Sequence, residues 1–385
     1  MKYLKYYIST LTLLIAIYVC SLGAFYPTIF FVCFSLFIIL GDIIFKKDSI
    51  EGYYKYPLLL NLPMYINFPL LLFLVFMTVF SLGNNPSLVL VNWFNSYFNI
   101  DILHIRNSMH AIDGFFLVAL TSLLIGIMGT VPGHELVHRK ANKIDMLMGN
   151  WLLAISWDCA FAVEHVYGHH KNVGLQSDPA TAKRGENIYA FILRAIAKEQ
   201  MGAWQIEKAR LRMSGNTIFS FNNRMLIGYV RSLFITGMAY VISGIGGMLI
   251  FLLCSFIAKS LLEVINYTEH YGLVRVEGQP VKPHHSWNTN SVISSIYLYN
   301  VTRHSSHHEK SHLKYWELKP YVNAPTMPQG YLSMLYMAIF LPVLFHKVMV
   351  KKLIDWDNNY ANAEERKLSN IQNQNSNISL LQNKS

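Results

Sequence analysis

The chain has 385 residues, of which 53% are apolar, 14% aromatic and only 14% charged. Soluble domains usually carry about 25% charged residues, so this composition, with a mean hydropathy of +0.29, excludes an ordinary soluble protein. It indicates several membrane spans and one substantial polar segment. The formal net charge of +10 does not indicate a nucleic-acid partner, because the basic residues flank apolar runs, as cytoplasmic anchors do.

Six apolar runs follow one another along the chain, and each is near the roughly 20 residues that a helix needs to cross a bilayer. Phe25-Tyr26-Pro27 separates the first two runs as a tight turn, so we interpret the N-terminus as a membrane hairpin rather than a signal peptide. Pro63 and Pro69 predict a kink or a short break in the third run. The expected spans are about 6–23, 28–45, 58–82, 115–131, 225–243 and 247–264.

Two further segments lie after the last expected span. The run from Tyr331 to Val350 is apolar but contains Pro342 and His346, so we interpret it as interfacial or partly buried. From about Asn358 the chain is rich in Asn, Gln, Ser and Lys, without an apolar period, which predicts a disordered tail. We therefore expect a membrane-embedded domain over residues 1–357 and a disordered polar tail over 358–385.

The distribution of Lys and Arg predicts how the spans are oriented. Lysines flank the first hairpin on one side, and twelve basic residues lie in the segment 133–224. If the chain crosses the membrane six times, the lysine-rich side of the first hairpin, the segment 133–224 and both termini are all cytoplasmic. The predicted fold is an all-α, six-helix, multi-pass bundle in the inner (cytoplasmic) membrane, with a histidine-rich cap on its cytoplasmic side.

The four cysteines do not form a CxxC pair. Three of them lie in apolar runs and the fourth in an apolar, helix-like stretch: Cys20, Cys33, Cys254 and Cys159. We interpret them as buried small apolar groups rather than a disulfide framework or a zinc site. Without paired cysteines, we expect no iron–sulfur module within this chain.

Nine of the fifteen histidines fall into four motifs. These motifs are Gly-His-Glu-Leu-Val-His with His134 and His138, Glu-His-Val-Tyr-Gly-His-His with His165, His169 and His170, Asn-Tyr-Thr-Glu-His-Tyr-Gly-Leu with His270, and Arg-His-Ser-Ser-His-His with His304, His307 and His308. Residues three or four apart share one face of a helix. Three histidine pairs can therefore each point two imidazoles at one centre. These pairs are His134/His138, His165/His169, and His304 with His307 or His308. Because the expected topology puts every motif on the cytoplasmic side, the sequence predicts a metal centre there.

The number of histidines favours two metal ions over one. Imidazole binds zinc, copper, iron and nickel, but a structural zinc site closes with four ligands, and nine histidines exceed that. Nearby carboxylates are expected to accept hydrogen bonds from the ligand imidazoles and orient them. The candidates for this second-shell role are Glu135, Glu164, Asp178 and Glu269.

Two other functions deserve comparison with this one. His134-Glu135-Leu136-Val137-His138 matches HExxH, in which Glu135 would activate water in an intramembrane zinc metalloprotease. The other histidine motifs count against it, because one zinc ion would need only one more protein ligand. A metal transporter would place its ligands within the spans near the bilayer midplane, whereas the expected spans carry almost no ionisable groups.

The order HxxxH, HxxxHH and HxxHH, after membrane hairpins, resembles the membrane di-iron superfamily of fatty acid desaturases and hydroxylases. The motif from Asn266 to Leu273 is similar to an additional signature of its alkane 1-monooxygenase branch, and the likeness covers about residues 114–320. Two departures, Arg139 where that branch usually has Lys and Ser306 where an acidic residue is common, suggest a sister group. Neither departure removes a histidine, but the identity of the substrate stays open.

The resemblance implies a di-iron centre held by the nine motif histidines, with O2 as co-substrate and no catalytic residue beyond the metal ligands. It implies hydroxylation of an alkane or similar lipid-like chain that enters from the bilayer. Electrons would come from a rubredoxin-type carrier and its NAD(P)H reductase. A fatty acyl desaturase or fatty acid hydroxylase of the same superfamily is the alternative.

The remaining histidines lie outside this scheme. His104 and His110 fall on the outer side of the expected topology, so they should not reach the centre. His284, His285 and His312 fall on the inner side, where we expect them to be second-shell or surface groups.

Overall fold

The computed structural model describes residues 2–45, 47–99 and 101–383. In this described part the chain is helical, without β-strands, and its only β-type pairings are the isolated bridges Lys47–Ser291 and Asn288–Thr326. The prediction of an all-α protein is therefore confirmed. The chain divides into two compact units. The first unit consists of Met1–Phe37, Lys55–Cys159 and Leu226–Lys259. The second consists of Ile38–Tyr54, Ala160–Met225 and Ser260–Ser385.

Five helices within the described ranges are long and apolar enough to cross a membrane. They cover Leu4–Ser21, Tyr26–Ile44, Leu58–Leu82, Ala111–Val137 and Arg224–His270. The apolar pattern of the sequence predicts six spans, and the difference lies in the last helix, which contains both the fifth and the sixth.

Helix α12 (Arg224–His270) has 47 residues. A straight helix of that length would measure about 70 Å, more than twice the roughly 30 Å of the hydrocarbon core. Ser243 (φ −150°) and Gly244 (φ 65°) have non-helical backbone angles and divide the helix into two arms. The interruption lies between the predicted spans 225–243 and 247–264, at the start of Gly244-Ile245-Gly246-Gly247. Glycine at this point adopts a positive φ without steric cost.

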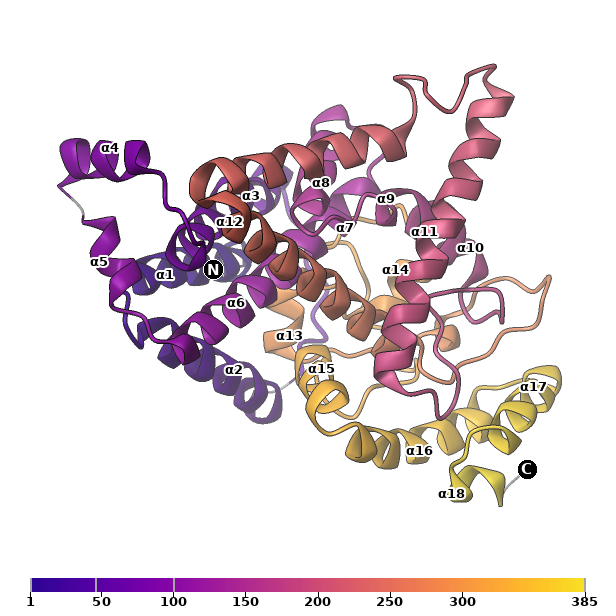
Figure 1. The fold of residues 1–385 in the computed structure, drawn as a ribbon. Helices are drawn as coiled ribbons and strands as arrows, with labels where there is room; N and C mark the ends of the chain where they lie inside the picture. The colour runs from indigo at the N-terminus through magenta and orange to yellow at the C-terminus, as the bar shows by residue number, and fades with distance from the viewer. Residues whose placement is uncertain (1, 46, 100, 384–385) are drawn as a thin grey trace. The chain divides into compact units, whose positions relative to one another are not determined.

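The first unit contains the N-terminal helices and the middle of α12 (Figure 1). Its elements are η1 (Leu4–Tyr6), α1 (Tyr7–Ser21), most of α2 (Tyr26–Ile44), α3 (Pro57–Leu82), α4 (Leu88–Phe98), α5 (Ile102–Asn107), α6 (Ala111–Ile125), η2 (Gly126–Thr130), α7 (Val131–Val137) and α8 (Lys143–Ile155). Helix α3 continues through Pro63 and Pro69, so the short break allowed for by the sequence does not occur. Pro63 cannot donate to the carbonyl of Leu59 four residues earlier, and the Tyr7 hydroxyl of α1 donates to that carbonyl instead, at 2.8 Å.

Helices α7 and α8 approach closely because a glycine stands on each side of their contact. A Cβ atom on Gly149 would lie 3.1 Å from the Gly133 carbonyl oxygen, closer than side chains normally pack. Just beyond α7, Arg139 forms ion pairs with Glu135 (2.6 Å) and with Asp145 of α8 (3.3 Å). The end of α7, which carries the HExxH motif, is thereby fixed on α8.

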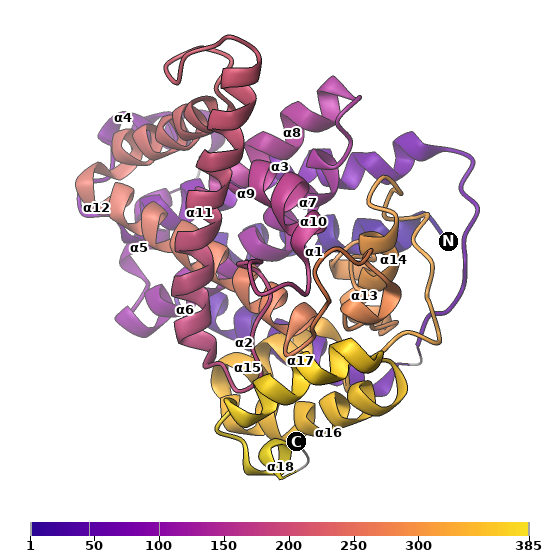
Figure 2. The same ribbon diagram turned by 90° about the vertical axis from the view of Figure 1, so that its right-hand side faces the viewer.

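The second unit contains the remaining elements. They are α9 (Phe161–Glu164), η3 (His165–His169), α10 (His170–Asn172), α11 (Ile188–Met213), the end of α12, η4 (Pro283–His285), α13 (Val292–Tyr297), α14 (His304–Glu309), α15 (Tyr331–Phe340), α16 (Pro342–Asn359), α17 (Ala363–Gln374) and α18 (Ser379–Gln382). Asp42, at the end of α2, accepts hydrogen bonds from Ser294 of α13 (2.6 Å) and Ser333 of α15 (2.9 Å). Helices α16, α17 and α18 gather next to one another at the C-terminal end in both ribbon views (Figures 1 and 2).

The predicted disorder after residue 358 is wrong for residues 358–383. Asn362 caps α17, its side chain accepting from two backbone N–H groups, and Glu365 and Asn373 are only 1% and 2% exposed. Buried Arg184 donates to Asp357 of α16 at 2.6 Å and to Asn373 at 2.7 Å. The sequence did not indicate this packing because the buried face of α17 is polar and is held by hydrogen bonds rather than by an apolar stripe.

Candidate metal centre

Four histidines of the second unit converge in its interior. His169 comes from the end of η3, His270 from the end of α12, and His304 and His308 from α14. Each offers one ring nitrogen, and these four nitrogens all lie within 4.8 Å of one another. All four residues are buried, so the cluster is shielded from water.

His169 is held in the orientation of a metal ligand. Its Nδ1 donates to both carboxylate oxygens of Asp178, at 3.0 and 3.1 Å, and Asp178 in turn accepts from the Thr181 hydroxyl at 2.6 Å. The other nitrogen, Nε2, is buried and has no hydrogen-bond partner among the described residues. A carboxylate on one ring nitrogen and an open lone pair on the other is the usual arrangement of a metal-bound histidine.

Hydrogen bonding alone does not account for the nitrogens that converge here. His270 Nδ1 donates to the backbone carbonyl of His285 at 3.3 Å, so its Nε2 carries a lone pair, and that atom lies 3.0 Å from His304 Nε2. His304 Nε2 also lies 3.0 Å from His308 Nε2 and 3.2 Å from a Glu269 oxygen. A neutral imidazole nitrogen carries at most one hydrogen, which can satisfy only one of these three neighbours. A cation at the centre would accept all the lone pairs.

The spacing is compatible with imidazoles that share one ion. Two nitrogens bound to one ion at about 2.1 Å lie about 3.0 Å apart when their bonds meet at a right angle, and about 3.4 Å apart in a tetrahedron. The close nitrogen pairs of this cluster lie 3.0 Å apart.

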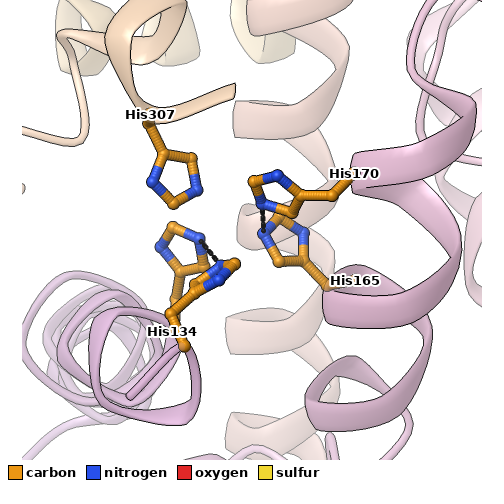
Figure 3. A group of neighbouring side chains, drawn as sticks. His134, His165, His170 and His307 are labelled. Atoms are coloured by element: carbon orange, nitrogen blue, oxygen red, sulfur yellow. Dashed lines mark hydrogen bonds between the residues drawn. The ribbon is translucent and has the colours of Figure 1, made fainter. Parts of the chain in front are cut away.

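A second group in the same unit consists of His165, His170 and His307. The ring nitrogens Nε2 of His165 and His170 lie 3.1 Å apart, and the ring of His307 in α14 lies 4.7 Å from that of His170, centre to centre (Figure 3). Candidate ligand atoms of the three also lie within 4.8 Å of one another.

The backbone of η3 decides which histidine joins which group. The α-helical spacing of His165 and His169 predicts that both can face one centre, but in the structure they join different groups. The segment His165–His169 is a π-helix, in which the His170 N–H donates to the His165 carbonyl five residues earlier. In this wider turn His165 pairs with His170, whereas His169 turns to the other group.

Burial favours the neutral form of one imidazole in each group, His307 and His308. It lowers the pKa of His307 to about 3, with a further contribution from His169, and it lowers the pKa of His308 together with the neighbouring imidazoles. For His169, burial alone would lower the pKa, but the adjacent Asp178 carboxylate outweighs it and the pKa is raised. Neutral imidazole is the form that binds a metal ion.

The first unit holds the remaining motif histidines as a pair. His134 lies in α7 and His138 directly follows it, and their Nε2 atoms lie 3.2 Å apart. This is the one-face geometry that the HxxxH spacing predicts.

The four predicted second-shell carboxylates lie in different surroundings. Asp178 accepts from His169, and Glu269 lies beside His304, as described above. Glu135 forms the ion pair with Arg139, and Glu164 is buried under Gly168, where a Cβ atom would come within 2.3 Å of its Oε1. Because its oxygen lies 3.2 Å from His304 Nε2, Glu269 is close enough to the ring nitrogens to act as a direct metal ligand rather than an outer acceptor.

Some contacts could not be found from the sequence. The carbonyl that holds His270 belongs to His285, whose own ring contacts Glu365 at 2.7 Å, and His284 contacts the same carboxylate at 3.3 Å. No motif surrounds Glu365, which lies in the segment expected to be disordered. His104 and His312 are exposed, as expected for histidines outside the centre.

The comparison with protein families agrees with the histidine motifs. A family model described as fatty acid desaturase matches residues 113–338, more than half of the chain. This stretch contains all nine motif histidines.

Several curated proteins are similar over a comparable stretch. Alkane 1-monooxygenase 1 of Pseudomonas aeruginosa is 36% identical over 236 residues, which are 60% of this chain and 61% of that protein. Alkane 1-monooxygenase of Ectopseudomonas oleovorans is 34% identical over 245 residues, covering 62% and 60%. The hydroxylase component of a xylene/toluene monooxygenase of Pseudomonas putida is 31% identical over 246 residues, covering 64% and 66%. The chain thus spans about three fifths of the length of the alkane monooxygenases, and the resemblance seen in its motifs is confirmed.

Proposed function

We propose that this chain, which belongs to the fatty acid desaturase family, hydroxylates an alkane or a similar aliphatic chain with O2 at a di-iron centre. The observation that carries the proposal is the buried four-histidine cluster, in which Asp178 orients His169 and lone pairs converge without enough hydrogens to satisfy them. The names of the similar proteins, most of them alkane 1-monooxygenases, supply the reaction class.

The nine histidines divide into two ligand sets in this proposal. His169, His270, His304 and His308 would hold one iron ion, with Glu269 beside them. His165, His170 and His307 would hold the other. The resemblance of the motifs to the family assigns the remaining two histidines, His134 and His138, to the di-iron centre as well.

The overall reaction requires an electron donor. One C–H bond, one O2, two electrons and two protons give one alcohol and one water, so each turnover consumes a two-electron reductant. When bound, the iron ions would supply the O2 activation that side chains alone cannot provide. We propose a rubredoxin-type carrier with an NAD(P)H reductase as the source, because this chain has four separate cysteines and its three buried ones are packed as apolar groups.

The protein's own contribution is to orient the ligands and exclude water. His270, His304 and His307 are at most 1% exposed, and this burial keeps bulk water away from the reacting centre. We further propose that the two arms of α12 cross the membrane separately, giving six spans with the centre and both termini on the cytoplasmic side of the inner membrane. An apolar substrate would then enter laterally from the bilayer.

Metal analysis together with product analysis tests the proposal. Full-length protein purified in lipid nanodiscs should contain about two iron ions per chain, since nine imidazoles exceed one coordination sphere. Supplied with the carrier, its reductase and NAD(P)H, it should convert n-alkanes of graded length to alcohols. Alkenes as the main product would favour a desaturase. One zinc ion and no oxidation would favour the HExxH metalloprotease.

A matched pair of variants ties the activity to the cluster. His270→Ala should lose iron and activity, because it removes a ligand from the four-histidine set. His312→Ala removes an exposed histidine close to the third motif and should retain both. If the two variants behave alike, the four-histidine cluster is not the site of the reaction.

A further inference from the structure

The short turn η4, between α12 and α13, touches the metal centre through its backbone. The carbonyl of His285 accepts from His270 Nδ1 at 3.3 Å, near the upper limit of a useful hydrogen bond. A small displacement of this carbonyl would break the contact and let the His270 ring rotate. The position of η4 therefore controls the orientation of His270.

The C-terminal helices hold η4 from the other side. Glu365 of α17 accepts from His285 Nε2 at 2.7 Å and from His284 Nε2 at 3.3 Å. Trp356 of α16 donates from its indole to the His284 carbonyl at 2.6 Å. Glu365 is 1% exposed and Trp356 is fully buried, so water does not compete for these bonds.

His284, His285 and Glu365 could also be viewed as a third metal site, since each offers a donor atom within 4.8 Å of the others. The tautomer of His285 argues against it. The backbone N–H of Lys282 donates to His285 Nδ1 at 3.0 Å, so the ring carries its hydrogen on Nε2 and donates it to Glu365. The nitrogen that faces the carboxylate therefore has no lone pair for a cation.

We propose that Glu365 is a positioning residue for the di-iron centre, acting through His285 on the metal ligand His270. Its carboxylate fixes the ring of His285, the ring fixes η4, and the carbonyl of η4 fixes the Nδ1–H of His270. The inference rests on the proposed function in one respect, that His270 binds iron. It assigns a role to α16 and α17, whose Trp356 and Glu365 lie beyond the 113–338 stretch shared with the family.

Replacing Glu365 should loosen one of the two ions. Removing a partner in direct contact with a ligand imidazole typically weakens metal binding by about 10–100-fold. Glu365 acts one residue further out, so we expect Glu365→Met to accelerate iron release from one of the two sites by about 3–10-fold. Glu365→Gln keeps an acceptor for His285 and should fall between Glu365→Met and the wild type.

The test uses full-length protein loaded with Fe(II) in nanodiscs. Release of iron to a chelator is followed in time, and X-ray absorption reports the ligand environment of the iron that remains bound. Two variants serve as controls. Glu364→Met changes the exposed neighbour on α17. Asn362→Ala removes the side-chain cap of α17, including its bond from the Glu365 backbone N–H, but leaves the Glu365 carboxylate and the His285 ring in place. Trp356→Phe removes the other support of η4 and should shift the release in the same direction as Glu365→Met.

Faster release and an altered absorption spectrum for Glu365→Met and Trp356→Phe, with both controls like the wild type, would support the positioning role. The positioning role would be overturned if Glu365→Met released iron at the wild-type rate. It would also be overturned if Asn362→Ala released iron as fast as Glu365→Met, because that result would show only a general loosening of α17. A third metal ion per chain that disappears in Glu365→Met would replace the relay with a metal site. Wild-type protein without iron would instead overturn the proposed function, so the two failures are distinguishable.

Discussion

The orientation of an imidazole in this protein depends on what its second ring nitrogen contacts. His169 donates from Nδ1 to Asp178, and His270 donates from Nδ1 to a backbone carbonyl. In both cases Nε2 is left to face the centre of the cluster. The two contacts differ in charge, because a carboxylate raises the basicity of the ring more than a carbonyl does.

Replacing Asp178 should therefore weaken metal binding without removing a ligand. In Asp178→Asn the amide oxygen can still accept from His169, but the charge is lost, and we expect iron affinity to fall by about 10–100-fold. Competition with a chelator of known affinity measures the change. Asp355→Asn, at an exposed carboxylate of α16, should leave the affinity unchanged. An unaltered affinity in Asp178→Asn would mean that His169 does not bind the metal ion.

The sequence could predict which histidines are candidates for metal binding, but not how those of the second unit divide into two groups. Their identity follows from motif composition, which does not depend on fine geometry. Their division depends on one extra residue in the turn of η3, which pairs His165 with His170 and lets His169 offer a nitrogen to the other group. The role of Glu365 was equally out of reach, because only the folded chain places α17 against η4.

At the level of elements, the π-helical turn of η3 needs the small residue at its centre. A Cβ atom on Gly168 would lie 2.3 Å from the buried Glu164 Oε1 and 3.3 Å from Ile206 of α11. The glycine therefore allows η3 to pack against α11 while it presents its histidines on two sides.

Gly168→Ala should destabilise the protein by about 1–3 kcal/mol, the usual cost of overpacking a buried site. Gly237→Ala in α12 is the matched control, because a Cβ atom there meets no other heavy atom within 4 Å. Alanine favours a helix interior over glycine by up to about 1 kcal/mol, so the control should be neutral or more stable. Thermal unfolding in detergent compares the two variants, and equal melting temperatures would show that η3 adjusts without strain.

A second element-level contact joins the end of α11 to the start of α12. The fully buried Glu207 carboxylate accepts from Arg210 at 2.7 Å, and from the side chain and backbone N–H of Arg224 at 2.8 and 2.7 Å. Burial alone would raise the pKa of Glu207, but these donors outweigh it and lower the pKa to about 2.

The low pKa gives Glu207 a defined pH dependence. A carboxyl whose pKa is lower in the folded state stabilises the fold above its unfolded pKa, here about 4.5, and loses that effect as the pH falls toward 2. Because both arginines are partly exposed, we expect Glu207→Gln to cost only about 1–2 kcal/mol at pH 7. The difference from wild type should shrink between pH 4.5 and pH 2, whereas Glu277→Gln, at an exposed site, should show no such trend. A pH-independent difference would contradict the ionised state of Glu207.

For the whole molecule, the open structural question is how often the chain crosses the membrane. Among the described residues, five helices qualify by length and composition, and the 47 residues of α12 are enough for two crossings. The apolar pattern of the sequence could predict the individual segments. It could not predict how the chain turns between the last two segments, because that depends on the backbone angles of Ser243 and Gly244.

The location of the two termini distinguishes five crossings from six. Six crossings place both termini on the same side of the membrane, and five place them on opposite sides. We expect fluorescent-protein fusions, which mature in the cytoplasm, to be fluorescent at either end. An alkaline phosphatase fusion, which is active only outside, should be inactive at both. Opposite results at the two ends would rule out a double crossing by α12.

Isotope labelling of the product tests the central claim most directly. Purified protein with the carrier, reductase and NAD(P)H is given an n-alkane under ¹⁸O2, and the product is analysed by mass spectrometry. Hydroxylation at the histidine-bound centre predicts an alcohol in which the oxygen atom is ¹⁸O, and loss of this product in His270→Ala but not in His312→Ala. An unlabelled alcohol, an alkene, or a labelled alcohol that persists in His270→Ala would contradict it.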